Sequence, residues 1–260
     1  MTKLLDVSGL CRSFGGLRAV EDLSFSLGCE EVLGMIGPNG AGKTTVVNLL
    51  SGVIRPGSGT VTLSGEDVTG LPPHLLARRG LVRTFQATTV WGGRTVRENA
   101  LRGAYFKRYP GFVPALLGTR RARGMRTEAD MLTDQLLRRF GLDKVAESVA
   151  GSLPYGLQKT LGIVIALAAE PRLILLDEPA AGLSAVESDH VRDAIMEVRR
   201  RGVSVLVIDH NMRFIAGLCD RIIVVVAGRT LAQGRPQDVL RDPAVVAAYL
   251  GNINVASRGR

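Results

Sequence analysis

The sequence predicts an α/β protein with a mostly parallel core sheet, and three short apolar runs carry this prediction. Residues 32–36, 172–177 and 204–208 are dominated by apolar side chains and are too short for typical helices. Such runs are typical of strands that are buried on both faces. Helices are predicted after the last two runs, from Val186 to Arg200 and from Asn211 to Leu218, so strands alternate with helices.

Length and composition fit one large domain, or one domain with a small appendage, because 46% of the 260 residues are hydrophobic. No apolar run reaches the roughly 18 residues that a membrane span needs, and the first residues lack the apolar core of a signal peptide. We therefore expect a cytoplasmic chain without a membrane span. The scattered Cys11, Cys29 and Cys219 are expected to be reduced thiols that fill the core.

The net charge of +9 indicates an anionic neighbour, which can be a nucleotide, a nucleic acid or an anionic membrane surface. Part of the excess lies between Arg102 and Arg126, where the chain has basic residues and no Asp or Glu. Two interpretations of this segment stay open. It is either a solvated helix face or a surface that lies close to phospholipid headgroups.

The first part of the chain is predicted to form antiparallel strands. Residues 4–9 and 21–27 alternate apolar and polar side chains, and a further short strand is expected over 60–63. Between the first two strands, Phe14 precedes a double glycine, so its ring either packs in the core or stacks on a purine with Val20 at its side.

Helices are predicted next to a short strand in the middle of the chain. Pro72 and Pro73 open a helix that runs through Arg79, and residues 81–86 form a strand that ends on Gln86. The pattern over 95–140 is helical with Pro and Gly interruptions, which indicates an inserted helical subdomain. A loop over 151–158 leads into a helix over 158–169. Beyond the last core strand we expect a strand hairpin about Gly228, and short helices near Val239 and Tyr249.

A glycine-rich loop follows the first buried strand and precedes a helix. Its sequence, Gly37 to Thr45, fits the pattern of a phosphate-binding loop, in which bare backbone amides and a helix N-terminus approach a phosphate chain. Lys43 can reach the β- and γ-phosphates, and the hydroxyl of Thr44 can bind Mg²⁺.

Acidic residues follow the other two buried strands, at the sheet edge where ligands bind in such proteins. Asp177 is the expected partner of Mg²⁺, directly or through water, and Glu178 is expected to orient or deprotonate an attacking water molecule. His210 follows Asp209 at the end of the next strand and can meet the γ-phosphate.

These features, in this order, resemble the ATPase subunits of ABC transporters. In the resemblance Phe14 is the adenine-stacking aromatic, Gly37 to Thr45 the Walker A loop, and Gln86 the Q-loop glutamine. Residues 153–157 take the place of the signature sequence, Asp177 and Glu178 are Walker B and the catalytic glutamate, and His210 is the switch histidine. The resemblance implies an ATP site formed by Phe14, Val20, Asn39, Gly40, Ala41, Gly42, Lys43, Thr44, Thr45, Gln86, Tyr155 and Gly156. It implies Mg²⁺ binding by Thr44, Gln86 and Asp177, and catalysis by Glu178, His210, Lys43 and Gln86.

Two departures from the family pattern matter, one in the signature region and one in the loop after Walker B. Pro154 and Leu157 replace the usual serine and glutamine, and Ser184 stands where an acid or Asn is usual. In the family this signature closes over the nucleotide of a partner subunit, so the loss of a hydroxyl donor is expected to weaken that contact. We expect the amide of Gly156 to remain available as a donor.

The resemblance implies one ABC ATPase domain over residues 1–260. Residues 1–94 and 160–260 form its core with an antiparallel β subdomain, and 95–159 form the helical subdomain. Within the family, residues 14–20, the basic insertion, the signature region and the ending 248–251 are similar to ATPase subunits of branched-chain amino-acid importers, and an importer of related small amides is an alternative.

The implied partners are a second ABC ATPase, identical or not, two permease subunits and, indirectly, a substrate-binding protein, at the cytoplasmic membrane face and without nucleic acid. Two other hypotheses stay open. One is a soluble ABC ATPase that acts on nucleic acid or ribosomes, and the other is a regulatory subunit with impaired hydrolysis.

Overall fold

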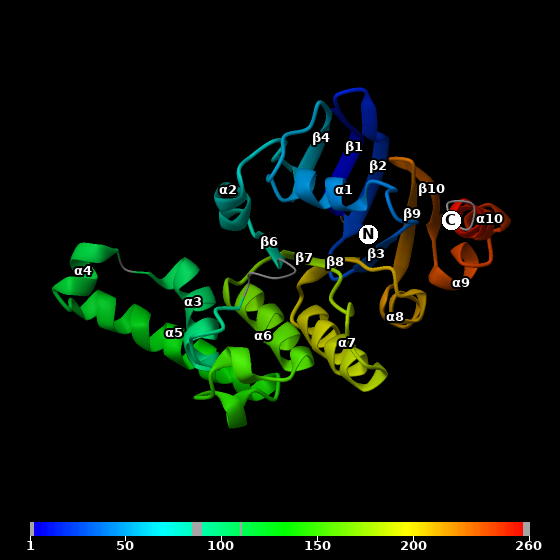
Figure 1. Ribbon diagram of the computed structural model, residues 1–260. Helices are drawn as coiled ribbons and strands as arrows, with labels where there is room; N and C mark the ends of the chain where they lie inside the picture. The colour runs from blue at the N-terminus through cyan, green and yellow to red at the C-terminus, as the bar shows by residue number, and fades with distance from the viewer. Residues whose placement is uncertain (1–2, 85–89, 110, 257–260) are drawn as a thin grey trace.

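The computed structural model describes residues 3–84, 90–109 and 111–256, and it contains two sheets and a group of helices (Figure 1). The smaller sheet is antiparallel and has the strand order β2-β1-β4-β5. Its strands are β1 (Lys3–Phe14), β2 (Leu17–Gly28), β4 (Ser58–Leu63) and β5 (Glu66–Asp67). The first two strands are longer than the alternation in the sequence predicts, because each continues past its apolar residues into the turn at residues 15 and 16.

The larger sheet has the order β10-β9-β3-β8-β7-β6, and all its pairings are parallel except that of β10 with β9. This confirms the predicted α/β class with a mostly parallel core sheet. The strands are β3 (Val32–Ile36), β6 (Leu81–Thr84), β7 (Leu173–Asp177), β8 (Ser204–Ile208), β9 (Arg221–Val226) and β10 (Arg229–Gly234). The last two form the hairpin expected about Gly228.

Successive side chains of the parallel strands point to opposite faces of the sheet and enter two separate cores. On one face Leu33, Met35 and Leu206 pack with the antiparallel sheet and α1 (Lys43–Leu50). On the other face Val32 and Ile36 pack with the helices. Both faces are covered, which explains why these strands are apolar throughout.

The helical segment after β6 forms three helices, which extend to one side of the sheets (Figure 1). They are α3 (Val96–Arg108), α4 (Phe112–Leu116) and α5 (Arg120–Arg139). Both α3 and α5 pack on α6 (Tyr155–Ala168), which in turn packs on α7 (Ala185–Arg200). The remaining helical elements are α2 (Pro73–Arg78), α8 (Met212–Leu218), α9 (Pro236–Val239), α10 (Pro243–Ala256) and two short 3₁₀ turns, η1 (Asp143–Val145) and η2 (Ala150–Ser152).

Three details differ from the sequence predictions. The last helix, α10, has 14 residues and is not short. The helix expected from residue 158 begins at Tyr155, because the carbonyl oxygen of the N-cap residue Pro154 already accepts the amide of Gln158 (3.1 Å). Of the three cysteines only Cys219 is buried, while Cys11 is half-buried and Cys29 is exposed, so the prediction that all three fill the core is wrong.

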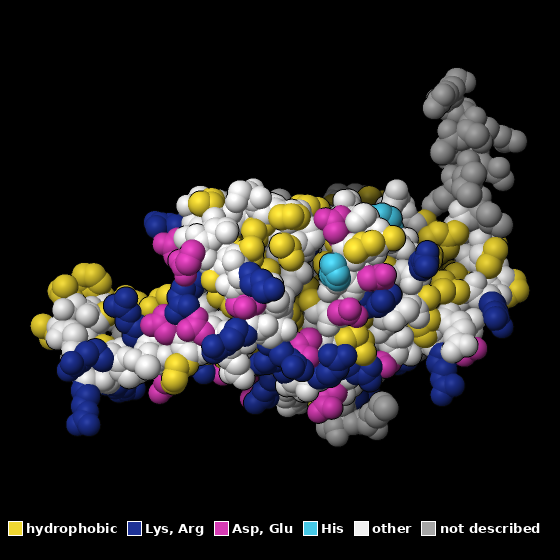
Figure 2. Space-filling view, turned by 90° about the horizontal axis from the view of Figure 1, so that it is seen from below, with side chains coloured by type: hydrophobic (Ala, Val, Ile, Leu, Met, Phe, Trp, Pro, Cys, Tyr) yellow, Lys and Arg dark blue, Asp and Glu magenta, His cyan; other side chains and the backbone are white. Residues whose placement is uncertain are grey.

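Across the described ranges no helix combines the length and the apolar content of a membrane span. Hydrophobic side chains are nevertheless exposed at the end of the molecule that carries α4, at the left in the view from below (Figure 2).

Candidate functional site

The phosphate loop lies between β3 and α1, as the sequence predicts. Gly42 precedes α1 with a left-handed backbone (φ 99°), and a Cβ atom there would meet the carbonyl oxygen of Ala19. Gly40 (φ 78°) faces open space, which leaves the loop bare where a ligand would approach. Neither a capping side chain nor a first-turn acid occupies the start of α1 among the described residues. This helix N-terminus is therefore suited to an anion.

Lys43 occupies the mouth of the loop. Its Nζ donates hydrogen bonds to the carbonyl oxygens of Gly37 (2.6 Å) and Pro38 (2.9 Å). Burial lowers the pKa of the Lys43 ammonium, and the charge of Glu178 acts in the opposite direction. Glu178 is thus close enough to Lys43 for their charges to interact. The other loop residues range from exposed to buried: Asn39, Gly40 and Thr44 are exposed, Thr45 is half-buried, and Ala41 is buried.

The register of the parallel sheet brings the acidic residues to the same edge as the loop. Ile208 of β8 lies opposite both Met35 of β3 and Asp177 of β7. One residue further on, the amide of Glu178 donates to the carbonyl oxygen of Ile208 (2.7 Å). The ends of three strands therefore meet here, and the structure places Lys43, Asp177 and Glu178 at the same edge of the sheet.

The carboxylate of Asp177 is held by Arg83, a residue that the sequence prediction missed. A guanidinium nitrogen of Arg83 lies 2.8 Å from Oδ2 of Asp177, and the two side chains are 8% and 9% exposed. The same guanidinium donates to Asn48 Oδ1 (2.7 Å) of α1 and to Ser51 Oγ (3.1 Å) directly after that helix. Arg83 thus ties β6 and α1 to the acidic strand end. An arginine inside a predicted core strand was the available signal, because a charge placed there requires a partner.

His210 lies beside the acidic pair. Its Nδ1 is 3.8 Å from Oε1 of Glu178 and 3.8 Å from Oδ1 of Asp209. Asp209 is fully buried, and its two oxygens accept the amides of Ala180 (3.0 Å) and Asn211 (2.9 Å). This carboxylate was not predicted as a site residue, yet it fixes the loops on which Glu178 and His210 sit. Such fixing positions the two side chains before any ligand binds.

The two residues expected to contact the base lie in different environments. Phe14 ends β1 with 46% of its surface exposed, and the guanidinium carbon of Arg12 lies 5.1 Å from the ring centre. Val20 is only 1% exposed and packs in the core between the sheets. The structure therefore presents the ring of Phe14 and not the side chain of Val20 as an accessible surface.

The signature region leads directly into α6. Tyr155 is 46% exposed, and the ammonium of Lys159 lies 5.1 Å from its ring centre. The amide of Gly156 is directed at Oε1 of Glu187 (3.4 Å), which also takes part in a capping box with Ser184 at the start of α7. The expectation that this amide is simply available is thus corrected, because Glu187 already accepts from it. The predicted residue Gln86 lies outside the described residues.

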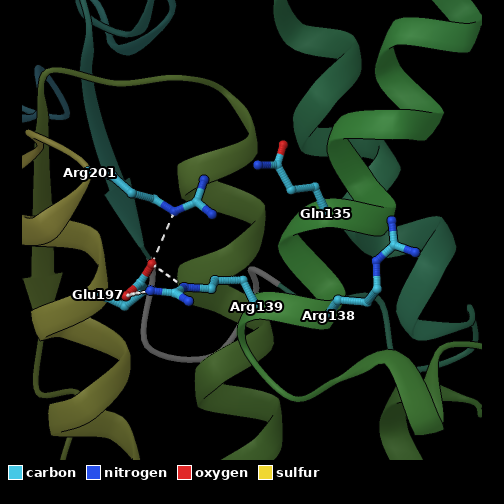
Figure 3. A pocket seen from close by; sticks show the side chains of 5 residues that line it. All are labelled: Gln135, Arg138, Arg139, Glu197 and Arg201. Atoms are coloured by element: carbon cyan, nitrogen blue, oxygen red, sulfur yellow. Dashed lines mark hydrogen bonds and ion pairs between the residues drawn. The ribbon is translucent and has the colours of Figure 1, made fainter.

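A cavity of about 530 Å³ lies elsewhere, between α5 and the end of α7 (Figure 3). Glu197 accepts hydrogen bonds from Arg139 (2.6 and 3.0 Å), Arg200 (3.1 Å) and Arg201 (3.4 Å). These arginines lower the pKa of Glu197 to about 2, Arg139 most strongly. Since α7 ends where the chain turns back into β8, this cavity is at the opposite edge of the sheet from the phosphate loop. The cavity lies at the contact between two helices and is not the nucleotide site.

A bare phosphate loop beside paired acids on a mostly parallel sheet defines a nucleotide-binding protein of the P-loop class. Residues 20–181 match the family model described as ABC transporter, and the chain belongs to this family. Residues 229–252 also match the model described as branched-chain amino acid ATP-binding cassette transporter.

Curated relatives extend over nearly the whole chain. It is 40% identical over 95% of its length to the high-affinity branched-chain amino acid transport ATP-binding protein BraF of Pseudomonas aeruginosa, 98% of which is covered. The corresponding protein LivG of Escherichia coli has the same identity and the same coverage. The lipopolysaccharide export ATP-binding protein LptB of Haemophilus influenzae is 32% identical, with 95% of this chain and 97% of that protein covered.

Solved structures of ATP-binding cassettes superpose on the fold of this chain. A nucleotide-free ATP-binding cassette from an ABC transporter superposes with a TM-score of 0.83 at 29% identity, covering 95% of this chain and 99% of that one. An ATP-binding cassette in its ADP conformation gives 0.84 at 29% identity, covering 96% and 100%. The predicted ABC-type ATPase fold is confirmed.

Proposed function

We propose that this chain is the ATP-hydrolysing subunit of an importer for branched-chain amino acids or closely related small amides. The observation that carries the hydrolytic part is the meeting of Lys43, Asp177, Glu178 and His210 at one edge of the parallel sheet. The cargo rests on the relatives BraF and LivG, which are 40% identical to this chain.

Binding of ATP would begin at the start of α1. The amides of residues 39–45 would take the phosphates, and the ring of Phe14 would stack on the adenine. Lys43 would exchange the carbonyl oxygens of Gly37 and Pro38 for phosphate oxygens. Because those two hydrogen bonds hold its ammonium at the loop, little reorganisation is needed for this exchange.

The residues at the strand end suit Mg²⁺. The hydroxyl of Thr44 and the carboxylate of Asp177 are hard oxygen donors, and Arg83 engages Oδ2 of Asp177. No group of three or more His, Cys, Asp or Glu among the described residues is placed to hold a metal. Two protein oxygen donors suit an ion that also binds substrate phosphates. Mg²⁺ would neutralise phosphate charge there, with Gln86 as a proposed further ligand.

Glu178 and His210 would act on the water molecule. Glu178 can accept its proton or fix its orientation, and His210, 3.8 Å away, can hold the γ-phosphate. Asp209 keeps the loops that carry Glu178 and His210 in place by accepting the amides of Ala180 and Asn211.

We further propose that the whole chain is one ABC ATPase unit that works as a dimer, homo- or heteromeric, with two permeases and a binding protein at the cytoplasmic membrane face. Residues 1–94 and 160–260 would form the core and 95–159 the helical subdomain, although the boundary at 160 falls inside α6. The signature region with Tyr155 and Gly156 would contact the partner's nucleotide, and Gln86 would report nucleotide state to the helices.

One observation favours a second candidate, a regulatory subunit that hydrolyses ATP poorly. The acceptor Glu187 engages the amide of Gly156 that would otherwise contact the partner's nucleotide. In that case Lys43 would still bind ATP, but the dimer would turn over slowly.

The test measures ATP binding and steady-state hydrolysis on the purified chain, with and without co-purified permeases. We expect Lys43→Ala to weaken ATP binding by roughly 10-fold or more, because a charge-assisted contact is lost. Glu178→Gln should retain binding while turnover falls by roughly 100-fold or more. Wild-type turnover in Glu178→Gln would refute the catalytic assignment. Turnover near that of Glu178→Gln in the wild-type assembly would favour the regulatory candidate.

A further inference from the structure

The basic segment between residues 102 and 126 divides into two parts in the structure. The first part is engaged by the protein itself. The guanidinium carbon of Arg102 lies 4.1 Å from the ring centre of Trp91, Lys107 donates to the carbonyl oxygen of Glu170 (2.8 Å), and Arg108 pairs with the carboxylate of Glu170 (2.8 and 3.0 Å). Lys107 and Arg108 hold the end of α3 against the loop after α6, whereas Arg102 contacts the segment before α3.

The second part is exposed. The first turns of α5 carry four arginines, Arg120, Arg121, Arg123 and Arg126, and all of them are exposed. None forms a salt bridge with a described residue. Helix α5 instead anchors itself through its opposite side, where Ala122, Ala129 and Thr133 are buried. The arginines therefore remain available to an external anion.

Helix α4, directly before these arginines, is apolar and exposed. The exposed fractions are 73% for Phe112, 60% for Val113, 74% for Leu116 and 71% for Leu117. The helix has no buried residue at all. Exposure of four neighbouring large apolar side chains is unusual for a soluble surface. The view from below shows this hydrophobic cluster at the end of the molecule, with Lys and Arg side chains beside it (Figure 2).

We propose that residues 112–126, here called the tip, bind the surface of an anionic phospholipid bilayer. The apolar side chains of α4 would enter the boundary between headgroups and acyl chains, and the arginines at the start of α5 would contact lipid phosphates. An exposed aliphatic and aromatic cluster flanked by cations is the composition of interfacial membrane segments.

The chemistry favours a lipid surface over other partners. Nucleic acid would engage the arginines but would leave the leucines and valine in water. A one-turn helix is small for a specific protein interface, which typically takes about 20–30 residues a side. A bilayer needs no shape complementarity, so a few apolar side chains and cations suffice for weak binding. The tip would then orient the chain on the membrane, while other contacts bring the chain there.

The tip lies on α4 and α5 and uses none of the residues assigned to ATP. A failure of the membrane proposal can therefore be separated from a failure of the ATPase proposal, since ATP binding is measured on every variant. The probe is sedimentation of the full chain with vesicles of phosphatidylcholine mixed with phosphatidylglycerol, and with vesicles of phosphatidylcholine alone.

Two double variants test the apolar and the charged components of the tip. Leu116→Ser with Leu117→Ser removes apolar surface, and the matched control Val186→Ser changes an exposed apolar residue (66%) on α7. Arg120→Gln with Arg123→Gln removes charge, and the matched control is Arg235→Gln with Arg241→Gln, which are also exposed. We expect partitioning onto anionic vesicles to fall by roughly 10-fold for the leucine pair. The arginine pair should lower partitioning onto anionic vesicles by roughly 30-fold at low salt. The wild type should bind little to neutral vesicles. Both controls should partition like the wild type.

Equal sedimentation of the wild type and the leucine variant would overturn the proposal, as would equal binding to neutral and anionic vesicles. Recovery of the chain only by membranes that contain permease subunits would also overturn it and would assign the tip to a protein contact. Unchanged circular dichroism and ATP binding of the variants would show that they are folded.

Discussion

The edge of the parallel sheet and the helical end of the molecule differ in how their charged side chains are held. At the sheet edge Arg83 and Asp177 pair with 8% and 9% exposure, and Asp209 is fully buried. At the helical end Arg97 pairs with Asp134 at 32% and 38% exposure, and four arginines form no salt bridge with a described residue. Burial preorganises groups for chemistry, whereas exposure leaves them available for contact with another surface.

Breaking the buried pair should give the largest effect. Arg83→Met leaves the carboxylate of Asp177 buried without its cation, which costs about 3–5 kcal/mol. The free energy of unfolding, measured with urea and circular dichroism in the absence of nucleotide, should fall by that amount. The double variant Arg83→Met with Asp177→Asn should lose less than the sum of the single variants, because no buried charge remains.

The half-buried pair of Arg97 and Asp134 provides the comparison. Arg97→Met should lower the free energy of unfolding by no more than about 1 kcal/mol, since water already screens its contact with Asp134. Equal losses for Arg83→Met and Arg97→Met would contradict the difference drawn between the two regions.

The contact between the two regions can be tested at Gly103, where α3 crosses α6. A Cβ atom there would meet the carbonyl oxygen of Ile165 and come within 3.0 Å of Ala168 Cβ. Gly103→Ala should therefore force the helices apart and lower the free energy of unfolding by about 1–3 kcal/mol. In α5 a Cβ atom on Gly124 meets nothing within 4 Å, so Gly124→Ala should stabilise by about 0.5–1 kcal/mol through helix propensity.

Thermal unfolding of both glycine variants checks this prediction. A stabilised Gly103→Ala protein would show that α3 and α6 are less tightly packed than the structure indicates. Loss of stability in Gly124→Ala would point to an unrecognised contact on the outer face of α5.

The ion pair between Glu197 of α7 and Arg139 of α5 should make the contact between these two helices sensitive to acid. The pKa of Glu197 is lowered from 4.5 to about 2, so its stabilisation is complete above pH 4.5 and is lost as the pH falls towards 2. We expect Glu197→Gln to lower the free energy of unfolding by about 1–2 kcal/mol at neutral pH, a value reduced for the exposure of Arg139 and Arg200.

Urea titrations of the wild type and Glu197→Gln across this pH range provide the measurement. The difference between the two proteins should shrink as the pH falls below 4.5. A difference that stays constant with pH would exclude the charge of Glu197 as its source.

Much of the core could be predicted because buried parallel strands have an unmistakable apolar pattern. The same pattern placed Asp177 and Glu178 at strand ends, and the register then brought them to Lys43. Periodicity identified the helices at the other end, but it did not show that α4 has no buried residue, because a short apolar helix looks the same in the sequence whether buried or exposed.

The partners of side chains were the part that the sequence could not supply. Arg83 lies 94 residues from Asp177, and no local pattern links them. Likewise, Gly156 was expected to present a bare amide, and only the packing of α6 beside α7 reveals Glu187 as its acceptor. Val20 was predicted to contact the adenine because it lies close to Phe14 in the sequence. The pairing of β1 with β2 instead buries the side chain of Val20.

The smallest expected effects come from two capping boxes, one in each region. Thr95 caps α3 with Glu98, and Ser184 caps α7 with Glu187. Replacement of either cap by alanine removes one side-chain acceptor from a helix start, which costs about 1 kcal/mol. Thr95→Ala and Ser184→Ala should therefore show similar losses in the free energy of unfolding.

Their effects on turnover should differ. Backbone and hydroxyl hydrogen bonds from Ser184 lower the pKa of Glu187 and fix its carboxylate beside the Gly156 amide. Ser184→Ala removes the hydroxyl and loosens this carboxylate, so it should change steady-state ATP hydrolysis by roughly 2- to 5-fold if that amide meets the partner's nucleotide. Thr95→Ala, which is matched in stability, should leave hydrolysis unchanged. Parallel changes in both variants would mean that hydrolysis follows stability alone and that Glu187 does not control the signature region.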